Sequence, residues 1–333
     1  MRLLIKELEM DNIKNVNQLE EKNGRPSLTR VFSYVERYSE FYNVSKIYML
    51  VDFLWSVLFY GCSSMDYFLY KWFLLNRRGR SAFVTERYEN KFIRNHTSGK
   101  LAGIIDNKEE TLHYFSDFIQ RDWCGQRYHN TESDFLKFAN AHEKAIVKPP
   151  EGFGGVGVHI IDTCRDNPGW LFQYCKDNHL MVEALIEQNE KLNLLNPSSV
   201  NTIRVLVLDG EIIGATVRIG AGKAIVDNAH SGGFFAAIDI QSGIVISQAM
   251  NYRDEHYFAR PDTGVVIPGF RIPFWDDCKD FVILASKTMT ELKLLGFDIA
   301  ITPNGPTLVE VNSKPCLRLI QAPLGRGIKQ FFK

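Results

Sequence analysis

Three oxygen-bearing side chains near the end of the chain have the types and spacing of a metal site: Asp298, Glu310 and Asn312. Apolar residues alternate after Asp298, Pro303-Asn304-Gly305 has turn chemistry, and a second strand is expected over 307–312. Side chains alternate across a strand, so Glu310 and Asn312 share one face, which Asp298 joins if the strands pair. Such an all-oxygen site suits Mg²⁺. A polar hairpin edge with solvated carboxylates is the simpler alternative.

A glycine-rich loop lies earlier in the chain, between two expected strands. The first strand spans 144–148 and ends in Lys148, and the second continues through Ile161. The loop glycines lack Cβ atoms, so backbone N–H groups can close over an anion, and Lys148 could neutralise it. The strand–loop–strand order differs from that of a dinucleotide-binding turn or a P-loop. The glycines are Gly152, Gly154, Gly155 and Gly157.

Charged side chains also interrupt apolar strands in the middle of the chain. Arg204 and Arg218 lie in two strands joined by an Asp209-Gly210 turn. Two arginines on one sheet face suit a phosphoryl group or a carboxylate, although each could instead pair with a structural acid. Glu183 lies in the apolar run 180–186, and a buried carboxylate needs a partner. A polar loop that contains Asp227, Asn228, Gly232 and Gly233 could line a substrate site.

Bulk composition restricts the function classes. The chain has 333 residues, 45% of them hydrophobic, with 39 basic and 39 acidic residues. This zero formal charge gives no argument for nucleic-acid or membrane-surface binding. The six scattered cysteines fit a reduced, cytoplasmic protein, and the early charges predict no signal peptide. The apolar run 47–60 is too short to span a membrane and contains Asp52, so it predicts a buried or docking helix, with membrane-surface binding as the alternative.

The remaining elements follow from periodicity and caps. Helices are expected over 1–23, 27–43, 47–60 and 67–75, which gives a mostly helical N-terminal region, and a short strand over 81–86. Further helices are expected from Asp106 or Asn107 to about Arg121, from a Thr131 or Ser133 cap to Ala141, and from Asp276 or Asp277 to Leu295. Strands are expected over 197–208, 212–219 and 234–240. The chain is therefore expected to be α+β, with the chemistry in its last two thirds.

These motifs, in this order, resemble the ATP-grasp superfamily, to which D-alanine–D-alanine ligase and glutathione synthetase belong. Within it the sequence from 106 to 323 most resembles the sugar-transfer-associated ATP-grasp family. One of the matching stretches is Glu310-Val311-Asn312-Ser313-Lys314-Pro315. The resemblance covers about two thirds of the chain. Cys316 departs from it, because a small residue such as Gly is expected after the proline. The N-terminal third matches only loosely, and acceptor specificity could lie there.

The resemblance implies two α+β lobes clasping ATP. It divides the chain into a mostly helical region at 1–105, a small lobe with the glycine loop at 106–186, and a large lobe with the metal hairpin at 187–333. Adenine would lie at Glu183, Ala184 and Leu185, where the lobes join, and ribose at Glu190. Lys108 and Lys148 would contact phosphates under the loop, and Mg²⁺ would bind the hairpin. Asn201 joins the substrate-binding set, and Arg204 or Arg218 would stabilise charge in catalysis.

The implied activity is ATP-dependent carboxylate–amine ligation through an acyl phosphate. The substrates would be small carboxylates and amines, including sugar acids or amino acids, in polysaccharide or glycoconjugate biosynthesis. Two alternatives remain open at this stage: a phosphotransferase with a hydroxyl acceptor on the same scaffold, and a nucleotide-binding module without chemistry. The residues do not identify the acid, the amine or the oligomeric state.

Overall fold

The computed structural model describes residues 28–97, 99–152, 154–163, 169–222, 227 and 232–332. The helix expected over 1–23 lies outside these residues. The chain divides into two compact units, Met1–Glu89 and Asn90–Lys333. Within the described residues no helix is both long enough and apolar enough to cross a bilayer.

The described part of the first unit is helical, as expected. Its helices are α2 (Leu28–Tyr42), α3 (Lys46–Tyr60), α4 (Ser64–Leu69), the 3-10 helix η1 (Trp72–Leu74) and α5 (Arg77–Ser81); α6 (Glu86–His96) crosses into the second unit. The strand expected over 81–86 is wrong. Ser81 ends α5, and the Thr85 hydroxyl accepts a hydrogen bond from the Tyr88 N–H, which starts α6 instead.

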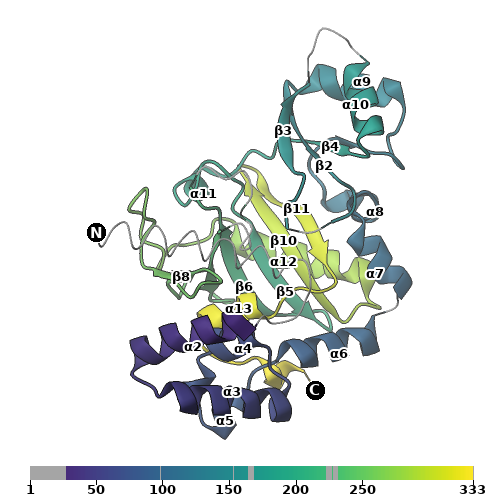
Figure 1. The fold of residues 1–333 in the computed structure, drawn as a ribbon. Coiled ribbons are helices and arrows are strands. Elements are labelled where there is room, and N and C mark those ends of the chain that lie inside the picture. The colour runs from purple at the N-terminus through teal and green to yellow at the C-terminus, as the bar shows by residue number, and fades with distance from the viewer. Residues whose placement is uncertain are drawn as a thin grey trace. The chain divides into compact units, whose positions relative to one another are not determined.

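A small antiparallel sheet begins the second unit. It contains β1 (Trp123–Cys124), β2 (Lys144–Lys148), β3 (His159–Asp162) and β4 (Met181–Ala184), in the order β1-β4-β2-β3. Helices α9 (Glu132–Ala141) and α10 (Trp170–Asp177) pack on it, and Phe135, Val147 and Leu171 share their apolar core. Figure 1 shows both helices beside this teal sheet. Thr131 caps α9 through a capping box, as expected.

A larger, seven-stranded antiparallel sheet has the order β11-β10-β5-β6-β7-β8-β9. Its strands are β5 (Ile203–Leu208), β6 (Glu211–Ile219), β7 (Phe234–Ile238), β8 (Ala249–Met250), β9 (His256–Tyr257), β10 (Leu294–Thr302) and β11 (Gly305–Asn312). Two antiparallel sheets with a helical N-terminal region confirm the α+β class.

Helices cover both faces of this sheet (Figure 1). One face shares a core with α7 (Gly99–Asp106) and α12 (Trp275–Ser286). The other face meets α13 (Arg318–Leu324), and the approach is so close that a Cβ on Gly214 would lie 2.5 Å from Ile320 Cγ2. The remaining elements are α8 (Lys108–Tyr114), α11 (Glu190–Asn193) and the 3-10 helices η2 (Ser116–Phe118), η4 (Lys287–Met289) and η5 (Lys329–Phe331).

Two expected helices end early. The helix expected to reach Arg121 does begin after an Asn107 cap, but α8 ends at Tyr114 and only η2 follows. The helix expected to reach Leu295 ends at Ser286, with η4 to Met289. The physical reason is strand pairing, because Leu294 and Leu295 pair with Leu208 and Val207 of β5 and so belong to β10.

Candidate functional site

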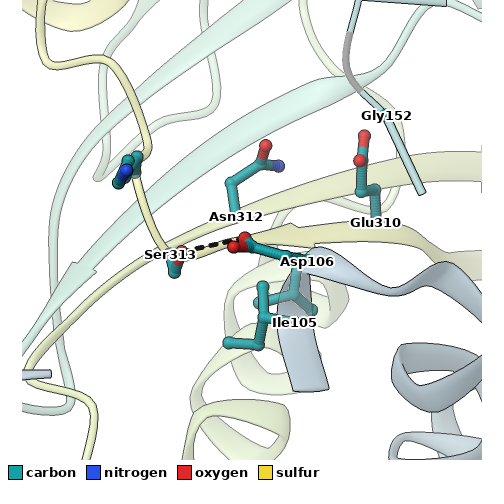
Figure 2. A pocket seen from close by; sticks show the side chains of 8 residues that line it. Ile105, Asp106, Gly152, Glu310, Asn312 and Ser313 are labelled. Carbon is teal, nitrogen blue, oxygen red and sulfur yellow. Dashed lines mark hydrogen bonds between the residues drawn. The ribbon is translucent and has the colours of Figure 1, made fainter. Parts of the chain in front are cut away.

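The hairpin of β10 and β11 brings Asp298, Glu310 and Asn312 together. Asp298 lies opposite Glu310 in the strand register, and the Asn312 Nδ2 donates to Asp298 Oδ2 at 3.4 Å. Figure 2 shows Glu310 and Asn312 extending to the same side of β11. The alternating pattern after Asp298 and the turn at Pro303 and Asn304 therefore produce the shared polar face that the sequence predicts.

Asp298 is held by two arginines of neighbouring strands. Arg204 of β5 lies opposite it in register and donates from Nε to Oδ1 and, at 2.8 Å, from Nη2 to Oδ2. Arg218 of β6 donates from Nη1 to Oδ2 at 2.8 Å. Burial alone would raise the pKa of Asp298, but the two guanidinium groups lower it below its usual value. Arg204 and Arg218 are therefore both paired with a buried acid in this structure, as the alternative interpretation of the sequence expected.

Glu310 differs from Asp298 in its surroundings. Burial, followed by the neighbouring Asp298 charge, raises the pKa of the Glu310 carboxyl above its usual value. Within the described residues Glu310 forms no ion pair, although Lys148 and Lys108 are near enough to act on it electrostatically. A carboxylate in this situation gains from a bound cation.

The donor set fits Mg²⁺ by its chemistry. Mg²⁺ is usually held by one or two carboxylates, with water and phosphate completing its six oxygen ligands. Glu310 and Asn312 supply two oxygens without losing an ion pair, whereas Asp298 already accepts from both arginines. No group of three or more His, Cys, Asp or Glu side chains suited to a metal occurs among the described residues, so the protein alone does not form a closed cage.

A pocket of about 220 Å³ opens beside the hairpin. The Ser313 hydroxyl donates to Asp106 Oδ1 at 3.3 Å, which joins the end of α7 to the segment after β11 (Figure 2). The Glu310 carboxylate, the Asn312 amide and the Lys314 ammonium give the pocket polar groups suited to a phosphate–metal complex. Its lining residues are Ile105, Asp106, Gly152, Glu310, Val311, Asn312, Ser313 and Lys314.

The two predicted phosphate lysines lie on either side of the glycine loop's base. Lys108, at the first position of α8, donates from Nζ to the Gly152 carbonyl at 2.8 Å. Burial lowers its pKa, and the nearby Lys148 ammonium acts in the same direction. Lys148, at the end of β2, pairs with the Glu183 carboxylate. Two ammonium groups thus stand near the pocket.

The glycine loop has the backbone that its composition predicts. Gly152, Gly154, Gly155 and Gly157 have φ angles of 119°, 78°, 72° and 77°, a region that residues with a Cβ rarely enter. In the described part of the loop, Gly152, Gly154 and Gly155 have only exposed neighbours, whereas Gly157 is followed by the half-buried Val158. The Val156 side chain is 78% exposed. A loop of this kind can approach an anion with its backbone.

Arg121 is a site-supporting residue that the sequence reasoning missed. Its Nε donates to Glu183 Oε2 at 2.7 Å, and its Nη1 and Nη2 donate to the carbonyls of Leu308 and Val309 at 2.6 and 3.3 Å. Burial would raise the pKa of Glu183, but Arg121 and Lys148 lower it to about 2. The available signal was Glu183 itself, since a carboxylate in an apolar strand requires a cation.

The predicted nucleotide-edge residues are placed at the end of β4. Ala184 is buried, and its backbone N–H donates to the Asp122 carbonyl at 2.9 Å. Leu185, the next residue, is exposed, as is Glu190 at the start of α11. Leu185 and Glu190 are thus accessible to a ligand, whereas the Ala184 N–H and the Glu183 carboxylate already have protein partners.

The predicted substrate residues divide into two groups. Asp227 pairs with Arg218 Nη2 at 3.0 Å and accepts from the Thr202 N–H at 2.8 Å, so it belongs to the arginine cluster. Asn201 is fully buried, and its Nδ2 donates to the Gln188 side chain and to the carbonyls of Leu192 and Asn196. Asn201 therefore lies in a satisfied internal network, away from the pocket lining.

The glycine-ended loop is described only in part. Gly232 has a φ of 88° and is exposed, and Gly233 is buried where the chain enters β7. Asn228 lies outside the described residues, so its predicted contact with a substrate stays a prediction.

Comparisons with known proteins match part of the chain. Residues 169–333, just under half of the chain, match the family described as sugar-transfer associated ATP-grasp. A glutathione synthetase from Gloeobacter violaceus is 26% identical over 148 residues, which are 43% of this chain and 40% of that protein. A probable alpha-L-glutamate ligase from Shewanella pealeana is 25% identical over 55% of this chain and 31% of that protein. The chain thus spans less than half the length of these relatives.

The solved structures that match part of the chain include the D-alanine–D-alanine ligase from Bacillus anthracis complexed with ATP. That structure has a TM-score of 0.38 and 14% identity over 64% of this chain and 56% of that chain.

Proposed function

We propose, from the premise that this chain belongs to the ATP-grasp superfamily, that it is an ATP-dependent carboxylate–amine ligase. The observation that carries the proposal is that Glu310, Asn312, Lys314 and Gly152 of the glycine loop line one pocket, with the Lys108 ammonium bonded to the Gly152 carbonyl. Triphosphate chemistry needs oxygen ligands for a divalent cation and positive charge along the phosphates, and this pocket has both.

Glu310 and Asn312 are proposed to hold Mg²⁺. The bound cation supplies charge neutralisation on the phosphoryl group that is transferred. Its binding would also offset the burial and the repulsion from Asp298 that together raise the Glu310 pKa. Asp298 then acts chiefly by orienting Arg204 and Arg218, whose guanidinium groups lie on the same side of the sheet.

Lys108 and Lys148 are proposed to bind the phosphates. The Lys108 ammonium is held at the loop's base by a neutral carbonyl, which leaves its charge available to an anion. Lys148 pairs with Glu183 at rest, and Arg121 can keep that carboxylate compensated when Lys148 contacts phosphate. The glycine loop would cover the triphosphate and exclude water, since hydrolysis would waste the acyl phosphate.

The substrates are proposed by chemical class. One substrate carboxylate accepts the γ-phosphoryl group to form an acyl phosphate, and an amine then displaces the phosphate to give an amide. The sugar-transfer association of the matched family favours a sugar acid or an amino sugar, in polysaccharide or glycoconjugate assembly. The two relatives named for glutathione and glutamate favour amino acids in the same panel.

The test is ADP release with Mg·ATP and a panel of sugar acids, amino acids and amino sugars, singly and in pairs, with mass detection of the product. A ligase requires an acid and an amine together, and its product has their summed mass minus water. A phosphorylated product without free phosphate would establish a phosphotransferase instead. Tight Mg·ATP binding without ADP release from any pair would favour a nucleotide-binding module.

A further inference from the structure

Helix α3 has an outward face made almost entirely of apolar side chains. Ile47, Val51, Leu54 and Leu58 follow one another at helical spacing and are 75%, 62%, 60% and 77% exposed. Tyr48, Trp55, Val57 and Phe59 lie beside them and are also exposed. The outward face of a surface helix is normally polar, so packing among the described residues does not explain this stripe. We call these eight side chains the α3 outer face.

The opposite face of α3 already supplies the helix's contribution to the core. Met49, Phe53 and Ser56 are buried against neighbouring helices of the unit. Asp52, the acid within the helix, faces inward, where Arg80 donates to its two oxygens at 2.7 and 2.8 Å and Tyr67 donates to it at 2.7 Å. The α3 outer face is therefore a second apolar surface, and none of it is needed to satisfy Asp52.

Exposed basic side chains outnumber exposed acidic ones in the described part of this unit, 28–89. From residue 43 to residue 85, the described side chains that are both exposed and charged are Lys46, Arg77 and Arg78. Arg77 and Arg78 belong to α5, which is joined to α3 through the buried Arg80–Asp52 pair. The acids of the same segment are Asp52, which is paired, and Asp66, which is buried. Lys46 pairs with the exposed Glu36 of α2 at 3.2 Å, so Arg77 and Arg78 are the basic groups by which this apolar, aromatic face complements an anionic surface.

We infer that the α3 outer face docks the protein on an anionic lipid bilayer. Leu and Ile side chains would enter the acyl boundary, Trp55 and Tyr48 would lie at the headgroup level, and the basic groups would contact lipid phosphates. The helix has 15 residues, shorter than the roughly 20 that a span requires, so it lies in the interface. This inference is independent of the ligase chemistry and makes the protein a peripheral one.

The test is co-sedimentation of the full-length protein with vesicles. Vesicles of phosphatidylcholine alone are compared with vesicles that also contain phosphatidylglycerol. We expect clear binding to the anionic vesicles, weaker binding to the neutral ones, and loss of the difference at high salt. Absence of binding to both kinds of vesicle would overturn the inference.

Two sets of variants separate the apolar and the charged contributions. Leu54→Glu with Leu58→Glu is expected to weaken vesicle binding about tenfold or more, since each change removes a large apolar side chain from the bilayer. Arg77→Gln with Arg78→Gln is expected to remove most of the preference for anionic vesicles, about fivefold for each charge. Circular dichroism of each variant confirms that it is folded.

Leu284→Glu is the matched control. Leu284 is a 58% exposed leucine on α12, in the other unit, so its replacement adds one negative charge, as each of Leu54→Glu and Leu58→Glu does, without touching the α3 outer face. Binding by this control is expected to equal that of the natural sequence, and an equal loss would overturn the assignment to α3. Concentration-dependent self-association that Leu58→Glu abolishes, without vesicle binding, would assign the face to a second copy of the chain.

Discussion

Arg204 of β5 and Asp298 of β10 lie directly opposite each other in the strand register and are joined by two hydrogen bonds between guanidinium and carboxylate. Both side chains are almost completely buried, at 7% and 2% exposure. Arg218 pairs with the same carboxylate and also with Asp227, so two acids balance the two guanidinium charges. This arrangement separates the acids of the hairpin into one that orients arginines and one, Glu310, that is available to a metal.

Asp298→Asn tests the orienting role. The change leaves Arg204 and Arg218 short of a buried counter-charge, and we expect it to lower the free energy of unfolding by about 3–5 kcal/mol. Urea unfolding measures this change. Asp209→Asn is the control, because the Asp209–Lys293 pair is exposed and 3.7 Å long, and its loss is expected to cost about 0–1 kcal/mol. Equal effects of the two changes would contradict the buried-pair account.

Glu310→Ala tests the metal role. If Glu310 holds Mg²⁺ against the phosphates, its removal is expected to lower the rate of ATP turnover about 100-fold or more. ADP release with saturating Mg·ATP measures this rate. The exposed Glu211 at the start of β6 offers a control, since Glu211→Ala changes the charge equally and is expected to keep full turnover. Near-normal turnover of Glu310→Ala would remove the metal assignment.

Glu310→Gln is expected to stabilise the ligand-free protein while it weakens Mg·ATP binding. The Glu310 pKa is higher in the folded protein than in the unfolded chain, so the protonated carboxyl favours folding. This stabilisation is lost as pH rises from the unfolded pKa through the folded pKa, because the ionised carboxylate disfavours folding. At pH 8 the variant should therefore melt at a higher temperature, by roughly 2–4 °C. The difference should shrink toward pH 4. Thermal melts across this range, without nucleotide or metal, provide the measurement, and a lower melting temperature at pH 8 would contradict the prediction.

The ionised Glu183 carboxylate is expected to increase the free energy of unfolding, whereas the ionised Glu310 carboxylate decreases it. The pKa of Glu183 falls from 4.5 to about 2 in the folded protein, so its stabilisation is complete above about pH 4.5 and is lost as pH falls toward 2. The full contribution is about 3 kcal/mol, of which about 2 kcal/mol is lost by pH 3. Urea unfolding between pH 6 and pH 3 should show a smaller pH dependence for Glu183→Gln. Glu211→Gln should keep the pH dependence of the natural sequence.

The backbone at Cys316 predicts an unusual order of stability between its glycine and alanine variants. Its φ of 58° lies in the left-handed region, which costs a residue with a Cβ roughly 1–2 kcal/mol and costs glycine little. We therefore expect Cys316→Gly to be more stable than Cys316→Ala by about 1 kcal/mol, the reverse of the order in a helix. Both variants lose the contact between Sγ and the Tyr252 hydroxyl at 3.4 Å, so their difference isolates the backbone. Greater stability of the alanine variant would show that the backbone has relaxed.

Local patterns explain most of the elements that could be predicted from the sequence. The turn at Pro303 and Asn304, the glycine loop, the Thr131 cap and the strands on either side of Asp209 depend on neighbouring residues, so they are readable in order along the chain. The departure at Cys316 was also readable, because the expected glycine and the observed positive φ have the same physical cause.

The missed features depend on partners that are distant in the sequence. The start of β10 at Leu294 is decided by pairing with Leu208, and a helical periodicity alone does not reveal that competition. The two arginines share Asp298, 94 and 80 residues away. Arg121 meets Glu183 and the carbonyl of Leu308, which are 62 and 187 residues from it. Such contacts follow from the assembled sheets rather than from any short motif.

The bonds of Arg121 also define a pivot. This one side chain is fastened to β4 of the small sheet through Glu183 and to β11 of the large sheet through two carbonyls. Any rotation of one sheet over the other that keeps these bonds must turn about this point, so displacement grows with distance from it. The base of the glycine loop, Lys148, is two residues beyond the register partner of Glu183, and Glu310 is two residues beyond Leu308, so such a rotation would displace both of them little.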